Sequence, residues 1–215
     1  MTRWGPRLFE CDNDIEIARN LIPSLGFNIT KWPHTLDQLV TQREPSEYLE
    51  NTVIPSLRTK LNACDFGARL FDACRARETT PKTKYRTIIL GALLMRAGAR
   101  IKPGDLEYLR IISNFVVCHS RDIEPGGEEG FVAPGRAQFL AAVDKYRDGV
   151  PRGYREQSCY QCGLTANDVG RQLIGCAKCG QDWYCSEDCQ NLHRQDHQLV
   201  CAWALSGLPF SENVA

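Results

Sequence analysis

The sequence lacks a net charge, because 26 lysines and arginines balance 26 aspartates and glutamates. A surface that follows nucleic-acid phosphates or an anionic bilayer needs an excess of cations, so this balance disfavours both ligands. A long apolar run is also missing. The longest one, 88–95, is interrupted by Gly91 and is far shorter than the ~20 residues of a membrane span. We therefore expect no membrane attachment, and the charge balance disfavours a nucleic-acid partner.

Signals for secretion and for common catalytic sites are absent as well. The N-terminal residues contain no apolar stretch of signal-peptide length, so we expect an intracellular protein of the cytoplasm and/or nucleus. No G-x-S-x-G, G-x-x-x-x-G-K-[ST], G-x-G-x-x-G or H-E-x-x-H motif occurs. The sequence thus predicts a protein that is not an enzyme.

Cysteine, in contrast, is abundant and unevenly placed. Seven of the 11 cysteines lie between Cys159 and Cys201. Disulfides are rare in reducing compartments, so a dense cluster indicates metal ligands. Elsewhere, Cys64, Cys74 and Cys118 follow apolar stripes or runs, and we expect them to be buried core thiols.

Residues 1–150 show the three-to-four-residue spacing of apolar side chains that is typical of amphipathic helices. The expected helices cover residues 12–25, 45–74 with a restart at Pro55, 85–97, 106–116 and 139–146, with a Gly/Pro-rich loop over 122–135. The segment 85–97 is apolar on most sides, which predicts a buried central helix.

The composition changes after Gly149, Pro151 and Gly153, which indicate a linker. The predicted organisation has four segments. They are a helical domain of unknown function (1–150), a linker (151–158), a small metal-binding module (159–201) and a C-terminal tail (202–215).

Eight potential ligands form four closely spaced pairs in the module. The pairs are Cys159-x2-Cys162, Cys176-x2-Cys179, Cys185-x3-Cys189 and His197-x3-Cys201. Structural zinc takes four sulfur or imidazole ligands in a tetrahedron, so eight ligands fill two sites and leave no open position for a catalytic water. Spacing alone allows the pairs to combine in sequence or to interleave. Because large apolar residues are few here, we expect zinc to supply the folding energy.

Two other zinc modules fit these ligands less well. Cys176-x2-Cys179-x13-His193-x3-His197 approaches the spacing of a DNA-binding finger. This assignment leaves five cysteines of the segment without a metal, and the segment has few cations to contact phosphates. A RING-type ubiquitin ligase also interleaves two sites, but its central histidine and closing C-x2-C are missing. Because His197-x3-Cys201 already completes the ligand set, we expect His193 to be solvated or to lie next to a ligand without binding the metal.

The segment 159–201 resembles the MYND zinc finger. The residues that carry the resemblance are Cys-Tyr-Gln-Cys (159–162), Cys-Ala-Lys-Cys (176–179), Trp-Tyr-Cys-Ser (183–186), Cys189-Gln190 and His-Gln-Leu-Val-Cys (197–201). The resemblance implies interleaved pairs and two Zn²⁺ per chain. One ion would be held by Cys159, Cys162, Cys185 and Cys189, and the other by Cys176, Cys179, His197 and Cys201. The fold class it implies is mainly α, with a helical N-terminal domain followed by a small two-zinc module.

The resemblance also implies a function. MYND modules bind partner proteins, often through proline-containing peptides, and Gln190 stands at a position that contributes to this surface. Arg194 stands where many members carry Trp, and a guanidinium does not directly replace an aromatic plane in proline stacking. We therefore expect a protein partner, with peptide binding around Gln190 and Arg194, and leave its peptide class open.

Two alternatives remain at this point. Some MYND proteins are lysine methyltransferases with an Asn-His-x-Cys core, but neither His34 nor His119 stands in such a sequence. An enzyme or enzyme subunit of another kind could still use the module for targeting, and nucleic-acid binding is less favoured. The N-terminal Trp4-Gly5-x3-Phe9-Glu10-x-Asp12 is similar to the start of a group of fungal MYND-containing proteins, which implies organisation and no activity.

Overall fold

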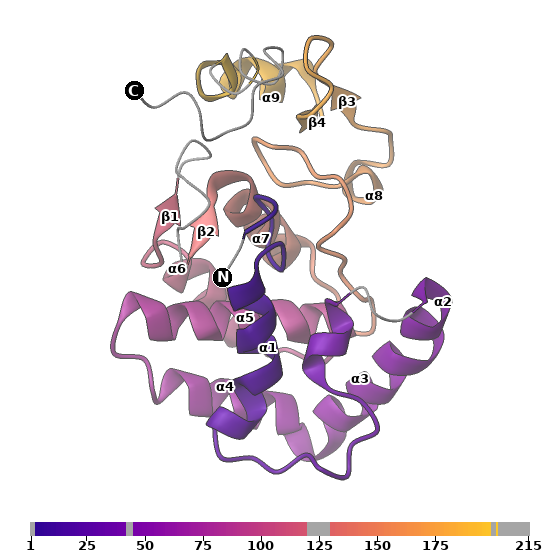
Figure 1. Cartoon of the computed structure of the whole chain (residues 1–215), viewed down its shortest axis with the longest axis vertical. Helices are drawn as coiled ribbons and strands as arrows, with labels where there is room; N and C mark the ends of the chain where they lie inside the picture. Colours follow the sequence, from indigo (N-terminus) through magenta and orange to yellow (C-terminus); the bar gives the residue numbers. More distant parts are fainter. Residues whose placement is uncertain (1–2, 42–44, 120–129, 199–200, 202–215) are drawn as a thin grey trace.

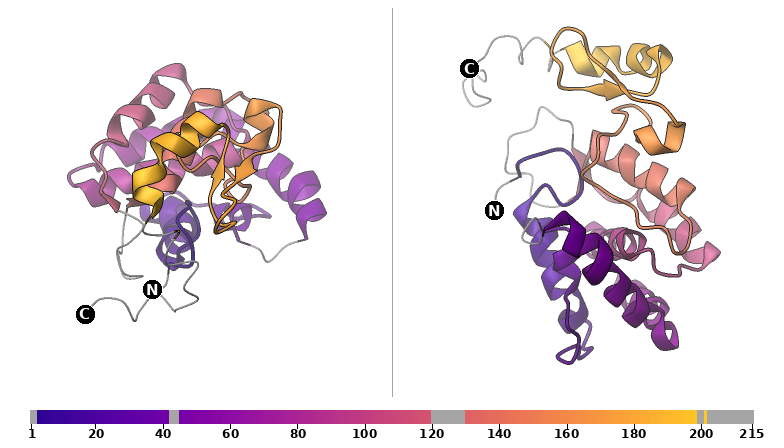
Figure 2. Two further views of the ribbon diagram at one scale, coloured as in Figure 1. Left: turned by 90° about the horizontal axis from the view of Figure 1, so that it is seen from above. Right: turned by 90° about the vertical axis from the view of Figure 1, so that its right-hand side faces the viewer.

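The computed structural model describes residues 3–41, 45–119, 130–198 and 201 of the chain. A larger helical part is followed by a small C-terminal part that lies at one end of the molecule (Figures 1 and 2). The chain is mostly helical, as the sequence predicts.

The helical part contains seven α-helices among its described residues, together with short 3₁₀ and π segments. In chain order they are α1 (Asp12–Ser24), η1 (Leu36–Leu39), α2 (Ser46–Tyr48), η2 (Leu49–Val53), α3 (Ile54–Asn62), η3 (Ala63–Asp65), α4 (Phe66–Arg75), α5 (Pro81–Ala97), α6 (Pro103–Ile112) and α7 (Ala133–Lys145).

Helix α5 is the centre of the core. Thr80 caps its first turn by accepting a hydrogen bond from the backbone N–H of Thr83, and Gly98 ends it with a φ of 67°. Helices α1, α3, α4, α6 and α7 all contact it. From Tyr85 to Ala97, only two arginines escape burial. The prediction of a buried central helix is confirmed.

The apolar stripe expected to continue from Pro55 to residue 74 is interrupted, so that part of the prediction is wrong. Cys64 and Asp65 have φ values of 48° and 51°, which end α3 and let α4 fold back. Residues with a positive φ do not continue a right-handed helix. The apolar residues after them therefore no longer lie on the same helix face as the apolar residues before them. Cys64 is therefore exposed, in contrast to our expectation, whereas Cys74 is buried as expected. Cys118 lies elsewhere, in a short strand, and is half-buried where we expected a buried thiol.

Short strands form two small sheets that the sequence did not reveal. Strand β1 (Cys118–His119) pairs in parallel with β2 (Phe131–Val132), and β3 (Ile174–Gly175) pairs antiparallel with β4 (Trp183–Tyr184). Most of the loop expected over 122–135 lies outside the described residues, but its end is wrong, because it forms β2 and the start of α7. The C-terminal part adds the short helices α8 (Ala166–Val169) and α9 (Glu187–Leu192).

The N-terminal segment is fixed to the core by a buried carboxylate. Asp14 has no exposed surface, and it accepts hydrogen bonds from the N–H of Phe9 (3.0 Å) and the hydroxyl of Tyr85 (2.8 Å). Phe9 itself is buried with a φ of 64°. One side chain of α1 thus ties the start of the chain to α5.

This tie can be tested with Tyr85→Phe. Removal of the hydroxyl leaves a buried carboxylate oxygen without its donor, which costs about 2 kcal/mol. Urea denaturation should show this loss, whereas Tyr48→Phe, at a tyrosine that is 42% exposed, should leave the free energy of unfolding unchanged. Equal stability of the two variants would contradict the assignment.

Candidate metal centre

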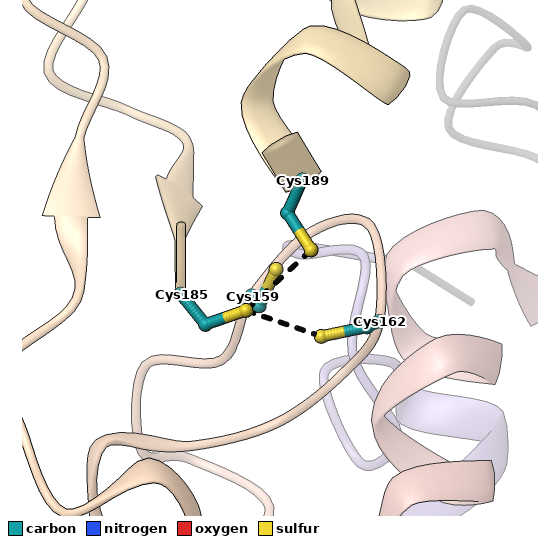
Figure 3. A group of neighbouring side chains, drawn as sticks. All are labelled: Cys159, Cys162, Cys185 and Cys189. Atoms are coloured by element: carbon teal, nitrogen blue, oxygen red, sulfur yellow. Dashed lines mark hydrogen bonds between the residues drawn. The ribbon is translucent and has the colours of Figure 1, made fainter. Parts of the chain in front are cut away.

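The first tetrad, made of Cys159, Cys162, Cys185 and Cys189, forms where a tight turn faces the end of β4. Cys159 and Cys162 belong to a knuckle in which Gly163 N–H donates to the carbonyl of Cys159 (2.8 Å) and Gly163 adopts a φ of 76°. Cys185 follows β4, and Cys189 lies on α9, whose first turn is capped by the Ser186 hydroxyl. Their sulfurs converge on one point (Figure 3).

A second knuckle repeats the geometry of the first. Gly180 N–H donates to the carbonyl of Cys176 (2.9 Å), and Gly180 has a φ of 66°. This knuckle brings Cys176 and Cys179 to His197, whose Nε2 lies 3.2 Å and 3.6 Å from their sulfurs. Cys201 completes the group, in which all ligand atoms lie within 4.8 Å of one another.

The two tetrads interleave along the chain. The first pair of ligands meets the third, and the second pair meets the fourth. This is one of the two arrangements that spacing leaves open, and it is the one that the family resemblance implies. All eight residues singled out from the sequence take part.

The tetrads have the size and chemistry that zinc requires. Zn–S bonds of ~2.3 Å in a tetrahedron place sulfurs ~3.8 Å apart and sulfur about 3.6 Å from an imidazole nitrogen. The Cys185 sulfur lies 3.5 Å from that of Cys162 and 3.5 Å from that of Cys189. One tetrad is made of cysteines alone and the other of three cysteines and a histidine, and both are consistent with two Zn²⁺ per chain.

The sulfurs cannot all ionise without a cation nearby. Burial raises the pKa of Cys189 and of Cys201 to about 11, and the neighbouring sulfurs add to the rise. Burial also opposes ionisation of Cys176. There the Cys179 N–H, the His197 side chain and the Lys178 N–H outweigh it and lower the pKa to about 6. A dication in each tetrad would stabilise every thiolate and release the remaining protons.

Two side chains outside the tetrads contact the histidine region. His193 lies outside both tetrads, as expected, and its Nδ1 is 3.0 Å from the Tyr184 hydroxyl. Asp182 is fully buried with its Oδ2 2.7 Å from Nδ1 of His197. Sequence reasoning missed Asp182. Its only signal is an acidic residue placed three positions after a ligand, in a chain with 26 acidic residues.

A family model for the MYND finger matches residues 159–201. These residues are a MYND zinc finger. The chain is also similar to the N-lysine methyltransferase SMYD2 of Gallus gallus, with 34% identity over 91 residues that cover 37% of this chain and 20% of that protein. The chain thus spans about a fifth of the length of the curated relative it matches. No solved structure matches. Among the described residues, no helix combines the length and apolar character needed to cross a bilayer.

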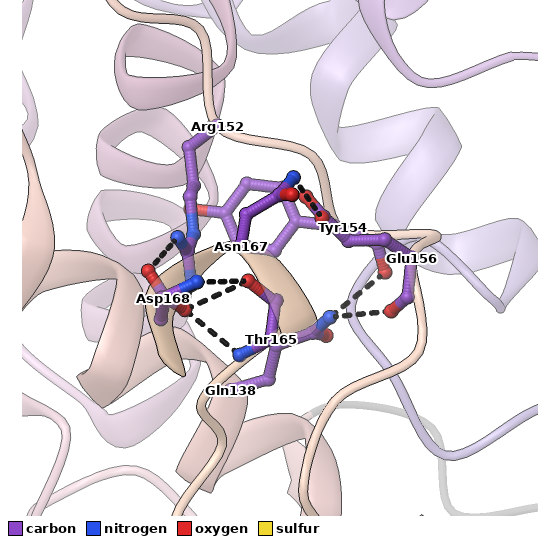
Figure 4. Close-up of polar contacts among 7 residues, drawn as sticks. All are labelled: Gln138, Arg152, Tyr154, Glu156, Thr165, Asn167 and Asp168. Atoms are coloured by element: carbon purple, nitrogen blue, oxygen red, sulfur yellow. Dashed lines mark hydrogen bonds and ion pairs between the residues drawn. The ribbon is translucent and has the colours of Figure 1, made fainter. Parts of the chain in front are cut away.

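Residues 151–158, which precede the finger, are packed against the helices. Tyr154 is 3% exposed, and its ring meets that of Phe9 edge-on at 5.6 Å. The fully buried Gln138 of α7 donates through Nε2 to the carbonyls of Tyr154 and Glu156, both at 3.3 Å. Figure 4 shows the two hydrogen bonds that Gln138 donates to this segment. The domain boundaries proposed above stay a prediction.

An ion pair continues this junction into the finger (Figure 4). The guanidinium of Arg152 donates to both oxygens of Asp168 at 2.6 Å, and Asp168 also accepts from the N–H and hydroxyl of Thr165. Burial raises the pKa of Asp168, but Arg152 and Thr165 outweigh it and lower the pKa to about 2. The ordinary value is 3.8. The contact therefore stabilises the fold at neutral pH, and this stabilisation is lost as the pH falls through 3.8 toward 2.

The first knuckle itself lies directly on α7. A Cβ at Gly163 would sit 1.9 Å from the carbonyl oxygen of Ala137, which is backbone and cannot move aside. The Arg7 guanidinium lies 5.8 Å from the ring centre of Tyr160, in the same knuckle. The finger is thus docked on the helical part through the knuckle of its first zinc site.

We predict that Gly163→Ala disrupts this docking. The matched control is Gly170→Ala, because Gly170 has a φ of 67° but nothing within 4 Å of its added Cβ. The control should lose only the ~1 kcal/mol of a left-handed alanine. Gly163→Ala should lose at least about 2 kcal/mol more, because the overlap must be relieved by backbone shifts.

Denaturation of the zinc-loaded variants measures both losses. A Gly163→Ala variant as stable as the Gly170→Ala control would show that the knuckle does not rest on α7.

Proposed function

We propose that this chain is a zinc-dependent interaction protein whose MYND finger binds a partner protein, and that it has no catalytic activity of its own. The observation that supports this most directly is the closed ligand set. Each tetrad supplies four protein ligands, so neither ion would have a position for substrate or water. The zinc ions then act as structural supports for a surface.

The surface we propose lies around α9. Figure 1 shows α9 on the side of the finger away from the helices. Leu192 at its end is 70% exposed, Arg194 is exposed and Gln190 is half-buried. The face opposite, which includes the first knuckle, is occupied by α7. A partner would therefore meet Gln190, Leu192 and Arg194.

The helical part offers little that resembles a catalytic centre. A hollow of about 840 Å³ lies beside α1, between Trp4, Phe9 and Arg155. Two of the charged groups that line it are engaged in ion pairs, Glu10 with Arg7 and Arg19 with Asp37. These pairs favour a structural role for both residues.

The similarity to a lysine methyltransferase covers only a fifth of that protein, and the Asn-His-x-Cys core is absent from this chain. An enzyme or enzyme subunit that uses the finger for targeting is the second proposal. A methyl-transfer assay with the chain alone tests whether the activity named for that relative extends to this chain, and we expect no turnover.

We also propose that the chain works in a reducing compartment, the cytoplasm and/or the nucleus. All 11 cysteines are free thiols in the structure, and the seven that belong to the tetrads have to remain unoxidised to bind metal. Nucleic acid is not expected as a partner, because the chain has no net charge.

Affinity capture with point variants tests the proposed surface. Leu192→Glu places a charge on α9 without touching a ligand, and we expect it to reduce recovery of the specific partner at least tenfold. Ile111→Glu is the matched control, because Ile111 is 48% exposed on α6 in the helical part. Both variants should retain the zinc content of the wild type.

The pattern of recovery decides the result. Partner loss with Leu192→Glu and retention with Ile111→Glu supports the proposal. Equal recovery with both variants would place the contact elsewhere, and recovery that persists with Cys176→Ser would show that the finger is not the binding surface.

A further inference from the structure

The imidazole of His197 is held between two groups of opposite character. On one edge, Nδ1 lies 2.7 Å from Oδ2 of Asp182, whose side chain has no exposed surface. On the other edge, Nε2 faces the sulfurs of Cys176 and Cys179 at 3.2 Å and 3.6 Å. Each ring nitrogen thus has a distinct neighbour, and the metal side and the carboxylate side cannot be exchanged by a small movement.

This arrangement determines where the proton of the ring lies. A neutral imidazole carries one proton, and the nitrogen that binds a metal must offer a lone pair. Nε2 faces the sulfurs, so in a ring that binds metal the proton belongs on Nδ1, which lies 2.7 Å from Asp182 Oδ2. A carboxylate in this position fixes the orientation of the ring and makes the opposite nitrogen a stronger electron-pair donor to a metal ion.

The backbone explains how Asp182 is held beside the second knuckle. The N–H of Cys176 donates to the carbonyl of Asp182 (2.8 Å), which continues the pairing of Gly175 with Trp183 in the β3–β4 hairpin. Two sulfur ligands and the carboxylate therefore belong to one hairpin. His197 comes from the segment after α9, so the orientation of its ring depends on contacts with this hairpin.

We propose that Asp182 is a positioning residue of the second zinc site. It accepts the Nδ1 proton of His197, selects the form of the ring that offers Nε2, and so raises the affinity of the histidine-containing tetrad for zinc. The all-cysteine tetrad contains no imidazole, so the effect is confined to one of the two ions. The proposal requires His197 to be a zinc ligand and is independent of any partner.

A competing arrangement uses the same residues. Asp182, His193 and His197 also lie within 4.8 Å of one another by their potential ligand atoms. They could form a ligand set of their own for a third ion. Two observations favour the positioning role. His193 Nδ1 contacts the Tyr184 hydroxyl at 3.0 Å, and the His193 ring is stacked on that of His197 with centres 6.0 Å apart.

Asp182→Asn and Asp196→Asn form the test pair. Both substitutions remove one carboxylate charge next to His197. Asp196 is exposed and is the residue directly before His197 in the sequence. Competition of the full chain with a chromogenic zinc chelator should resolve two ions. We expect Asp182→Asn to weaken one of them 10- to 100-fold and leave the other unchanged. Asp196→Asn should match the wild type at both ions.

A His197→Cys background separates positioning from a general structural role. With no imidazole to orient, the additional substitution Asp182→Asn should no longer weaken zinc binding. A loss of the same size in this background would overturn the proposal, because Asp182 would then act on the hairpin as a whole.

The protonation of His197 in the unaltered chain provides a measurement that needs no variant. Nitrogen-15 NMR of the zinc-loaded protein should show a proton on Nδ1 and metal on Nε2. The reverse assignment would overturn the proposal, as would a third bound ion or equal zinc affinity of Asp182→Asn and Asp196→Asn. A chain with no bound zinc would instead refute the metal assignment itself, which total zinc content reveals separately.

Discussion

Thiolates at a separation of 3.5 Å repel one another, and the C-terminal part of this protein depends on a cation that offsets that repulsion. The segment has few large apolar side chains, so burial alone cannot order it. Two zinc ions supply the missing energy and join segments that would otherwise be separate: two knuckles, a hairpin and the helix α9. Because the pairs interleave, each ion fastens an early segment to a late one, and the finger forms as a unit.

The same constraint extends into the helical part. The knuckle that carries Cys159 and Cys162 rests on the backbone of α7, and the residues before it are held by Gln138. The position of the finger therefore follows from side chains of the core. This docking covers one face of the finger and leaves α9 on the other side, which restricts where a partner can bind (Figure 1).

Local patterns predicted much of this arrangement from the sequence. A Cys-x2-Cys pair is a turn whose ligands are neighbours along the chain, so spacing alone identifies it. The burial of α5 could be predicted because its sequence is apolar on most sides. Spacing left the combination of pairs open, because that depends on how distant segments meet. Cys64 shows where periodicity fails, since two left-handed residues interrupt the helix without changing the pattern. Asp182 and Gly163 act through tertiary contacts that no local pattern records.

Native mass spectrometry of the reduced chain, combined with hydrogen exchange before and after chelation, tests the central claim most directly. The account predicts a mass that includes two zinc ions. It also predicts that chelation removes exchange protection from β3, β4 and α9 while α5 stays protected. A chain that carries no tightly bound metal and still protects the amides of the hairpin and α9 would contradict it.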